Sequence, residues 1–156
     1  MLSLLTRARS ASVAACSHAL HLVGPRIKGS RSQPTLLVVE DDEALRFALA
    51  ALLVREGYLV LTAATARDAL ATVRWRLEPV EVVILDVRLP DVSGAELCAR
   101  LRELYPHLPV IVCTGEGTPG EARGLLELGV RRYFRKPVSP DELLAAIEAT
   151  RSQPAP

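Results

Sequence analysis

The 156-residue chain has little cysteine and no long apolar run, and each of these features excludes certain classes of protein. Its three cysteines, Cys16, Cys98 and Cys113, are an odd number without the spacing of metal ligands. A disulfide framework and a zinc site are therefore not expected, and a reducing cytoplasm is the expected compartment. No apolar stretch approaches the roughly 20 residues that cross a bilayer, so no membrane association is expected.

Acidic residues are missing from the first 33 positions, which carry a formal charge of +5. The remaining residues contain 14 basic and 18 acidic side chains and carry −4. A mildly acidic remainder does not suit a nucleic-acid-binding surface of the usual strength. The basic, serine-containing start superficially matches an organellar transit peptide, but nothing later in the chain demands import. We therefore predict that residues 1–33 form a disordered basic extension, with an unused upstream start codon as the alternative.

Aromatic residues make up 4% of the chain and apolar residues 49%, which indicates one domain with an aliphatic core. Five short apolar runs, typical of buried strands, alternate with helical patterns. The runs are Leu36–Val39, Tyr58–Leu61, Val82–Leu85, Val110–Cys113 and Tyr133–Phe134. This alternation predicts an α/β fold, a doubly wound parallel sheet with helices on both faces.

Several helical segments have recognisable boundaries. The first is predicted to end at Gly57 and to bury a stripe formed by Leu45, Leu49, Leu52 and Leu53. Thr65 is predicted to cap the second. The last has Ser139 as its cap, Pro140 at its first position and Glu142 closing a capping box. Glycines interrupt the range 116–129, which predicts a weaker helix there.

Polar residues follow four of the five predicted strands. Glu40 and Asp41 follow the first, Asp86 the third, Thr114 the fourth and Lys136 the fifth. The carboxyl ends of parallel strands share one edge of the sheet, so these groups can converge. Neighbouring carboxylates repel one another without a cation, and oxygen ligands suit Mg²⁺ or Mn²⁺. With an ammonium and a hydroxyl nearby, this set is equipped to hold a phosphoryl group on Asp86.

Each of these residues alone has an ordinary explanation, such as a helix cap, a strand end or a solvated lysine. Their joint appearance at four strand ends favours a shared site. In these motifs the range 35–150 resembles a response-regulator receiver domain of two-component signalling. The matching motifs are Val38–Asp42, Ile84–Gly94, Val110–Gly115 and Tyr133–Pro137.

The resemblance implies a flavodoxin-like, five-stranded parallel sheet with strand order 2-1-3-4-5. It also implies a receiver domain over residues 34–150, followed by a short tail at 151–156. No room for a DNA-binding or catalytic output domain follows residue 150, so a stand-alone, chemotaxis-receiver-like protein is expected. A receiver fragment of a larger hybrid signalling protein remains an alternative.

The resemblance assigns Asp86 as the phosphoacceptor. It assigns Glu40, Asp41, Asp86 and the backbone carbonyl of Arg88 as ligands of Mg²⁺ (or Mn²⁺), with Asp41 a direct ligand and Glu40 acting through water. The expected donor is a histidine kinase or a histidine phosphotransfer protein.

On the phosphoryl side, Thr114 and Tyr133 resemble the switch pair, in which the hydroxyl moves onto the phosphoryl group and the ring swings inward. Lys136 resembles the lysine that contacts phosphate, and its bond to Pro137 is expected to be cis. The implied output is altered binding of a downstream protein partner, with neither nucleic acid nor membrane as a partner.

Charged residues beside the site suggest two further hypotheses. Arg88 and Glu116 lie two positions beyond Asp86 and Thr114, where a pair could form a gate that hinders attacking water. Arg131 and Arg132 stand before the last strand, where many receivers have acidic residues. They are either a solvated turn or a surface for an acidic partner.

Two rival functions remain open. An aspartyl-phosphate-forming phosphohydrolase of similar fold typically has a second aspartate two residues after the nucleophile, where this chain has Arg88. A flavodoxin-like binding module would need a phosphate loop where Glu40, Asp41 and Asp42 stand. We therefore expect a signalling receiver rather than an enzyme, with at most self-phosphorylation and self-dephosphorylation activity.

Overall fold

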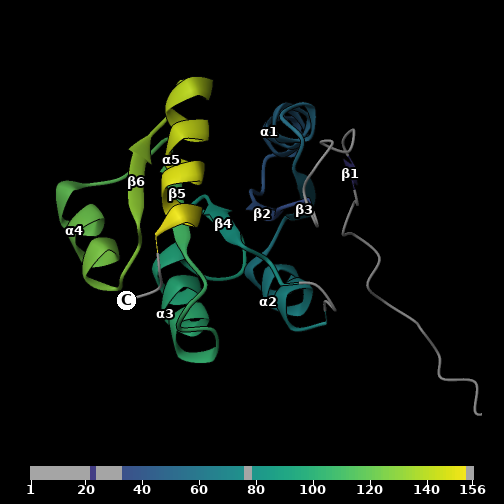
Figure 1. Ribbon diagram of the computed structural model, residues 1–156. Helices are drawn as coiled ribbons and strands as arrows, with labels where there is room; N and C mark the ends of the chain where they lie inside the picture. Colours follow the sequence, from purple (N-terminus) through teal and green to yellow (C-terminus); the bar gives the residue numbers. More distant parts are fainter. Residues whose placement is uncertain (1–21, 24–32, 76–78, 154–156) are drawn as a thin grey trace, which may run out of the picture.

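The computed structural model describes residues 22–23, 33–75 and 79–153 of the chain. A central sheet has the strand order β1-β3-β2-β4-β5-β6 (Figure 1). Its strands are β1 (Leu22–Val23), β2 (Thr35–Val39), β3 (Leu59–Ala63), β4 (Val82–Leu85), β5 (Val110–Thr114) and β6 (Arg132–Arg135). The strands from β2 to β6 are parallel, and β1 runs antiparallel to β3.

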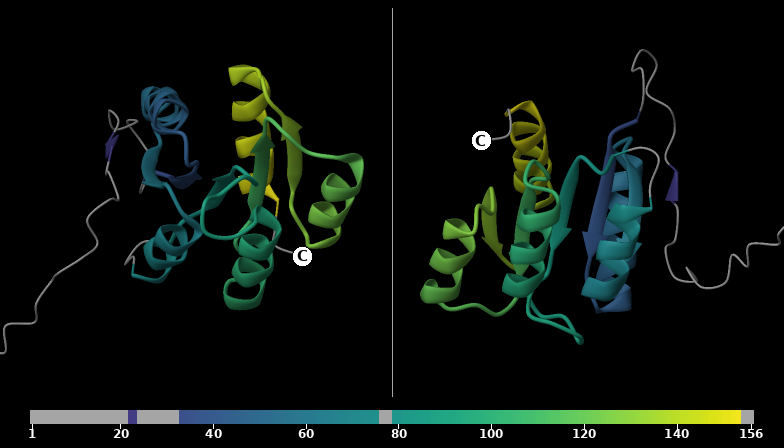
Figure 2. Two further views of the ribbon diagram at one scale, coloured as in Figure 1. Left: turned by 180° about the vertical axis from the view of Figure 1, so that it is seen from behind. Right: turned by 90° about the horizontal axis from the view of Figure 1, so that it is seen from below.

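In the described part of the chain, five helices lie over the two faces of the sheet, as Figures 1 and 2 show. They are α1 (Glu43–Arg55), α2 (Ala66–Arg74), α3 (Gly94–Leu104), α4 (Pro119–Glu127) and α5 (Pro140–Ser152). Alternate strand residues point to opposite faces, so Leu37 and Val39 pack with α2, α3 and α4. Leu36 and Val38 pack with α1 and α5 on the other face. Two aliphatic cores therefore hold the sheet in place.

The predicted α/β fold is confirmed. The parallel strands lie in the order β3-β2-β4-β5-β6, which is the expected order 2-1-3-4-5 when they are counted from β2. The edge strand β1 was not predicted. It pairs Leu22 with Val60 and Val23 with Leu59, within the range expected to be a basic extension. Residues 1–21 and 24–32 of that extension, Cys16 included, and residues 154–156 lie outside the described residues. Among those described, no helix has both the length and the apolar character needed to cross a membrane.

Two local predictions were wrong. Leu45 was predicted to be buried with the other leucines of α1, but it is 49% exposed. The buried residues of this helix are Ala50 and Leu53. Leu45 lies in the first turn, beyond the strand residues against which the later turns pack. At the start of α5, Ser139 is the cap residue but its side chain makes no capping hydrogen bond, so no capping box forms.

Two other helix starts are well capped, one of them as predicted. Thr65 caps α2, since its hydroxyl accepts the N–H of Asp68. The helix predicted within residues 116–129 is present as α4. It begins with a complete capping box between Thr118 and Glu121. The Thr-x-x-Glu spacing in the sequence was a usable signal for this box.

Backbone hydrogen bonds continue past the strand ends and fix the residues that follow them. The N–H of Asp86 donates to the carbonyl of Val39 at 2.9 Å, and that of Lys136 to Thr114 at 2.8 Å. The Lys136–Pro137 bond is cis, as expected. The strand ends of β2, β4, β5 and β6 thus meet at one edge with their polar residues held in place.

Candidate functional site

Three charged side chains meet at this edge of the sheet. The Nζ atom of Lys136 lies 2.5 Å from Oε2 of Glu40 and 2.6 Å from Oδ2 of Asp86. Glu40 is 4% exposed and Asp86 is 8% exposed, whereas the lysine side chain is 24% exposed. The ammonium group of Lys136 therefore bonds to one residue 96 positions earlier in the chain, Glu40, and to another 50 positions earlier, Asp86.

The second oxygen of Asp86 is held by the loop that follows β4. Its Oδ1 accepts the N–H of Arg88 at 3.0 Å. The loop is compact because the N–H of Gly94 donates to the carbonyl of Val87, and a β carbon on Gly94 would lie 2.4 Å from the Val87 Cα. Asp91 ties the loop to α2 by accepting two backbone N–H groups. The carboxylate of Asp86 is thus fixed in direction on both oxygens.

Burial and neighbouring charges shift the ionisation of two of these groups. Burial raises the pKa of Glu40, and the charge of Asp86 adds to this, while the hydrogen bond from Lys136 opposes it. Burial lowers the pKa of Lys136, but hydrogen bonds to Asp86 and Glu40 outweigh that effect and raise it overall. The ammonium therefore stays charged, and Glu40 is ionised less readily than a free glutamate.

Asp41 differs from Glu40 and Asp86 because it is exposed. The loop that carries it is fastened from α1 by Arg46. One guanidinium nitrogen of Arg46 donates to the carbonyls of Glu40 at 2.7 Å and Asp41 at 3.0 Å. Nothing in the sequence pointed to this role, because an arginine in the first turns of a helix is usually a solvated side chain.

The charged groups at this edge of the sheet suit a hard divalent cation, both in their net charge and in the type of donor atom. Glu40 and Asp86 share one ammonium, which leaves one uncompensated negative charge before Asp41 is counted, and all donors are oxygen. In the part of the chain that the structure describes, however, no three His, Cys, Asp or Glu side chains are gathered closely enough to hold a metal ion. The predicted ligand Asp41 is exposed and is therefore not gathered with Glu40 and Asp86 into such a group.

Thr114 and Tyr133 lie on neighbouring strands beside the cluster. The fully buried Thr114 hydroxyl donates to the carbonyl of Glu116 at 2.8 Å, so it is bonded to the β5–α4 loop and not to Asp86. Tyr133 is half-buried and packs against the core on the side of α3 and α4. The β5–α4 loop is therefore in contact with the strand end that bears the threonine.

Arg88 and Glu116 lie on the two loops that flank Asp86. Their side chains approach to 3.8 Å between Nε and Oε2, and they are 57% and 80% exposed. This is a long, solvent-exposed ion pair, and such pairs contribute at most about 1 kcal/mol.

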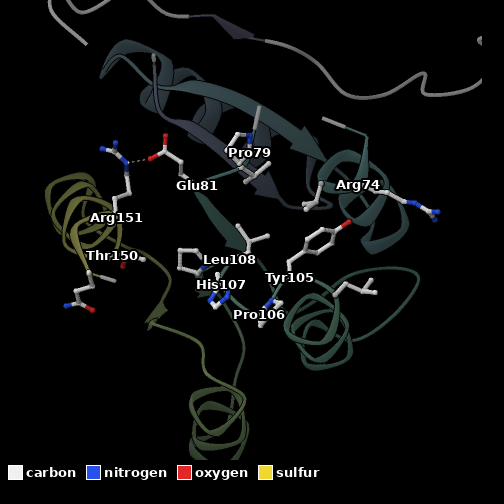
Figure 3. A pocket seen from close by; sticks show the side chains of 14 residues that line it. Arg74, Pro79, Glu81, Tyr105, Pro106, His107, Leu108, Thr150 and Arg151 are labelled. Carbon is white, nitrogen blue, oxygen red and sulfur yellow. Dashed lines mark hydrogen bonds and ion pairs between the residues drawn. The ribbon is translucent and has the colours of Figure 1, made fainter. Parts of the chain in front are cut away.

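A separate groove lies elsewhere on the described part of the molecule. It has a volume of about 760 Å³ and is formed by the start of β4 and the ends of α2, α3 and α5. Arg151 and Glu81 form an ion pair at 2.9 Å on its wall, with Tyr105 and His107 on the other side (Figure 3). It contains none of the predicted site residues, which lie at the opposite ends of the strands.

Comparison with known proteins places these features in a wider context. Residues 36–148 match the model of a family described as the response regulator receiver domain. The chain is similar to the transcriptional regulatory protein AfsQ1 of Streptomyces coelicolor, with 39% identity over 116 residues, 74% of this chain and 50% of that protein. It is 36% identical over 121 residues to GlrR of Escherichia coli, covering 78% of this chain and 27% of that protein. The chain thus spans about half or less of the length of these curated relatives.

Solved structures agree with this likeness. A CheY-like response regulator receiver domain protein from Methanospirillum hungatei superposes with a TM-score of 0.72 at 33% identity, covering 77% of this chain and 94% of that one. The non-phosphorylated HemR receiver domain from Leptospira biflexa gives 0.69 at 33% identity, covering 80% and 98%. Because the curated relatives are transcriptional regulators, the expectation that this chain binds no nucleic acid stays a prediction.

Proposed function

The chain belongs to the response regulator receiver domain family of two-component signalling, and we propose that it accepts a phosphoryl group on Asp86 from a phosphohistidine donor. Its relatives are regulatory proteins, which supports a signalling role rather than a metabolic reaction. The donor in this proposal is a histidine kinase or a histidine phosphotransfer protein. The consequence is a change in the binding of a downstream protein.

The observation that carries the proposal is the fixed carboxylate of Asp86 with Lys136 at 2.6 Å. In the transfer, an Asp86 oxygen attacks phosphorus, a P–O bond forms and the P–N bond of phosphohistidine breaks, leaving the electron pair on the imidazole nitrogen, which takes up a proton. Lys136 neutralises charge on the phosphoryl oxygens. Arg88 holds the other carboxylate oxygen through its backbone N–H and so orients the nucleophile.

We assign Mg²⁺ (or Mn²⁺) to Glu40, Asp41, Asp86 and the backbone carbonyl of Arg88. The bound ion would supply positive charge against the phosphoryl oxygens. The excess of carboxylate over ammonium charge supports this assignment. Arg46 would position the two acidic residues by holding their backbone carbonyls.

Phosphorylation is read out through Thr114 and Tyr133 in this proposal. The Thr114 hydroxyl exchanges its bond with the Glu116 carbonyl for one with a phosphoryl oxygen, and Tyr133 responds. The pair formed by Arg88 and Glu116 forms a weak gate that slows attack by water on the aspartyl phosphate. Output occurs on the surface over β6 and α4, where the exposed Arg132 favours an acidic partner.

Incubation with Mg²⁺ and acetyl phosphate, followed by mass spectrometry of the intact protein, tests the phosphoacceptor. One phosphoryl adduct is expected in the wild type and in Asp141→Ala, an exposed control in the first turn of α5. The adduct should be absent in Asp86→Ala. An adduct that persists in Asp86→Ala, or none in the wild type, contradicts the proposal.

A further inference from the structure

Gly117 lies where the hydroxyl of Tyr133 meets the β5–α4 loop. A β carbon on Gly117 would lie 2.0 Å from the Tyr133 hydroxyl oxygen and 3.4 Å from the Thr114 methyl carbon. Atoms without a bond do not approach to 2.0 Å, so the present position of the ring requires glycine at 117. The same loop at Gly115 has open space, since a β carbon there would meet nothing within 4 Å.

The conflict at Gly117 is confined to the hydroxyl group. The ring carbon that bears it, Cζ, lies 3.4 Å from the same β carbon, which is ordinary van der Waals contact. A tyrosine ring is rigid and moves only by rotation about its side-chain bonds. A methyl group at 117 would therefore displace the whole tyrosine ring, whereas a phenylalanine at 133 could stay in place.

Both residues of the switch pair contact this one loop. Thr114 donates its hydroxyl to the Glu116 carbonyl, and Tyr133 lies against the adjacent Gly117. A rearrangement of the threonine bond therefore acts directly on the backbone that bounds the tyrosine. Because both residues contact one short backbone segment, that segment gives a physical route from Thr114 to Tyr133 on β6.

We propose that Gly117 is the positioning residue of the switch, because the lack of a side chain there lets Tyr133 lie against the β5–α4 loop. A side chain at 117 displaces the ring and uncouples Tyr133 from the state of Asp86. The coupling part of this inference rests on the proposed function. The contact itself does not.

The contact can be tested in the unphosphorylated protein labelled with 3-fluorotyrosine. The chain has three tyrosines, so ¹⁹F NMR gives few signals, and Tyr133→Phe identifies the one from Tyr133. Gly117→Ala should shift that signal and leave those of Tyr58 and Tyr105 unchanged. Gly115→Ala is the matched control and should shift none. An unmoved Tyr133 signal in Gly117→Ala, or an equal shift in both variants, overturns the proposal.

A double-mutant cycle adds a second readout. Gly117→Ala should lower the urea midpoint in the wild-type background and have little effect in Tyr133→Phe, where the clashing hydroxyl is gone. Equal losses in the two backgrounds would mean that the alanine acts on the loop backbone and not through Tyr133.

The coupling is tested by adding Mg²⁺ and acetyl phosphate. Gly117→Ala should form the adduct on Asp86 as the wild type does, but its Tyr133 signal should no longer respond. An equal response in the two proteins overturns the coupling. Failure of both proteins to form an adduct refutes the proposed function, and the contact between Gly117 and Tyr133 is then still judged by the first two experiments.

Discussion

Replacement of Lys136 by methionine tests how the charges of the site are balanced. The substitution keeps most of the aliphatic side chain and removes the ammonium that bonds Glu40 at 2.5 Å and Asp86 at 2.6 Å. The two carboxylates, 4% and 8% exposed, then face each other without a cation. Without divalent metal, we expect the free energy of unfolding to fall.

The size of the loss follows from the burial of the groups. Removing one partner of a buried ion pair costs about 3–5 kcal/mol, and the partly exposed lysine places the expected loss near the lower end, about 3 kcal/mol. Domains of this kind unfold with about 5–15 kcal/mol, so the variant should remain folded. With a urea dependence of about 2 kcal/mol/M, the midpoint should fall by about 1.5 M.

The loss should also depend on pH. Burial already raises the pKa of Glu40 above that of a free glutamate, and Lys136 is the main group that opposes this rise. Removing the lysine raises the pKa further. A carboxyl with a raised folded-state pKa contributes stability that is fully present below its unfolded pKa and lost as pH rises through the folded pKa. The difference between Lys136→Met and wild type should therefore be largest at pH 7 and smaller at pH 5.

The assay is urea unfolding in EDTA at both pH values. Arg100→Met is the matched control, because Arg100 pairs with Glu96 in solvent on α3 and its loss should cost about 0.5 kcal/mol or less. If Lys136→Met loses no more stability than this control at pH 7, the carboxylates are not held by the lysine. A loss that does not diminish at pH 5 would show that Glu40 does not take up the proton.

Three further predictions concern the surroundings of the site. Arg88→Ala should shorten the lifetime of the aspartyl phosphate severalfold and no more, because an exposed pair contributes at most about 1 kcal/mol; an unchanged decay of the adduct would contradict the gate. Arg46→Ala should weaken Mg²⁺ binding in calorimetry, and Arg46→Lys should weaken it less; equal affinity in all three proteins would show that the loop needs no fastening. Burial raises the pKa of Cys98 and Cys113 to about 12, so in a Cys16→Ser background neither thiol should react with a disulfide reagent at pH 8 until urea unfolds the protein.

The local sequence was sufficient to predict the five parallel strands of the sheet but not the edge strand β1. Continuous apolar runs such as Val82–Leu85 can be buried only between two helix layers, and the order of strands and helices restricts their connection. The helix cap at Thr65 depends on a neighbour three residues away, and it is formed. Leu45 was misassigned because a helical stripe shows which residues share a face. Only the position of the sheet decides which turns of that face are covered.

For the site, the sequence determined which residues stand at the strand ends, since the length of each apolar run sets where its strand stops. The fold brought Glu40, Asp86 and Lys136 within hydrogen-bonding distance, and only tertiary structure decided that one ammonium bonds both carboxylates. The role of Arg46 and the contact between Gly117 and Tyr133 were likewise beyond the sequence. Such contacts depend on side-chain rotamers and loop paths, which are fixed by packing among residues far apart in the chain and leave no local pattern.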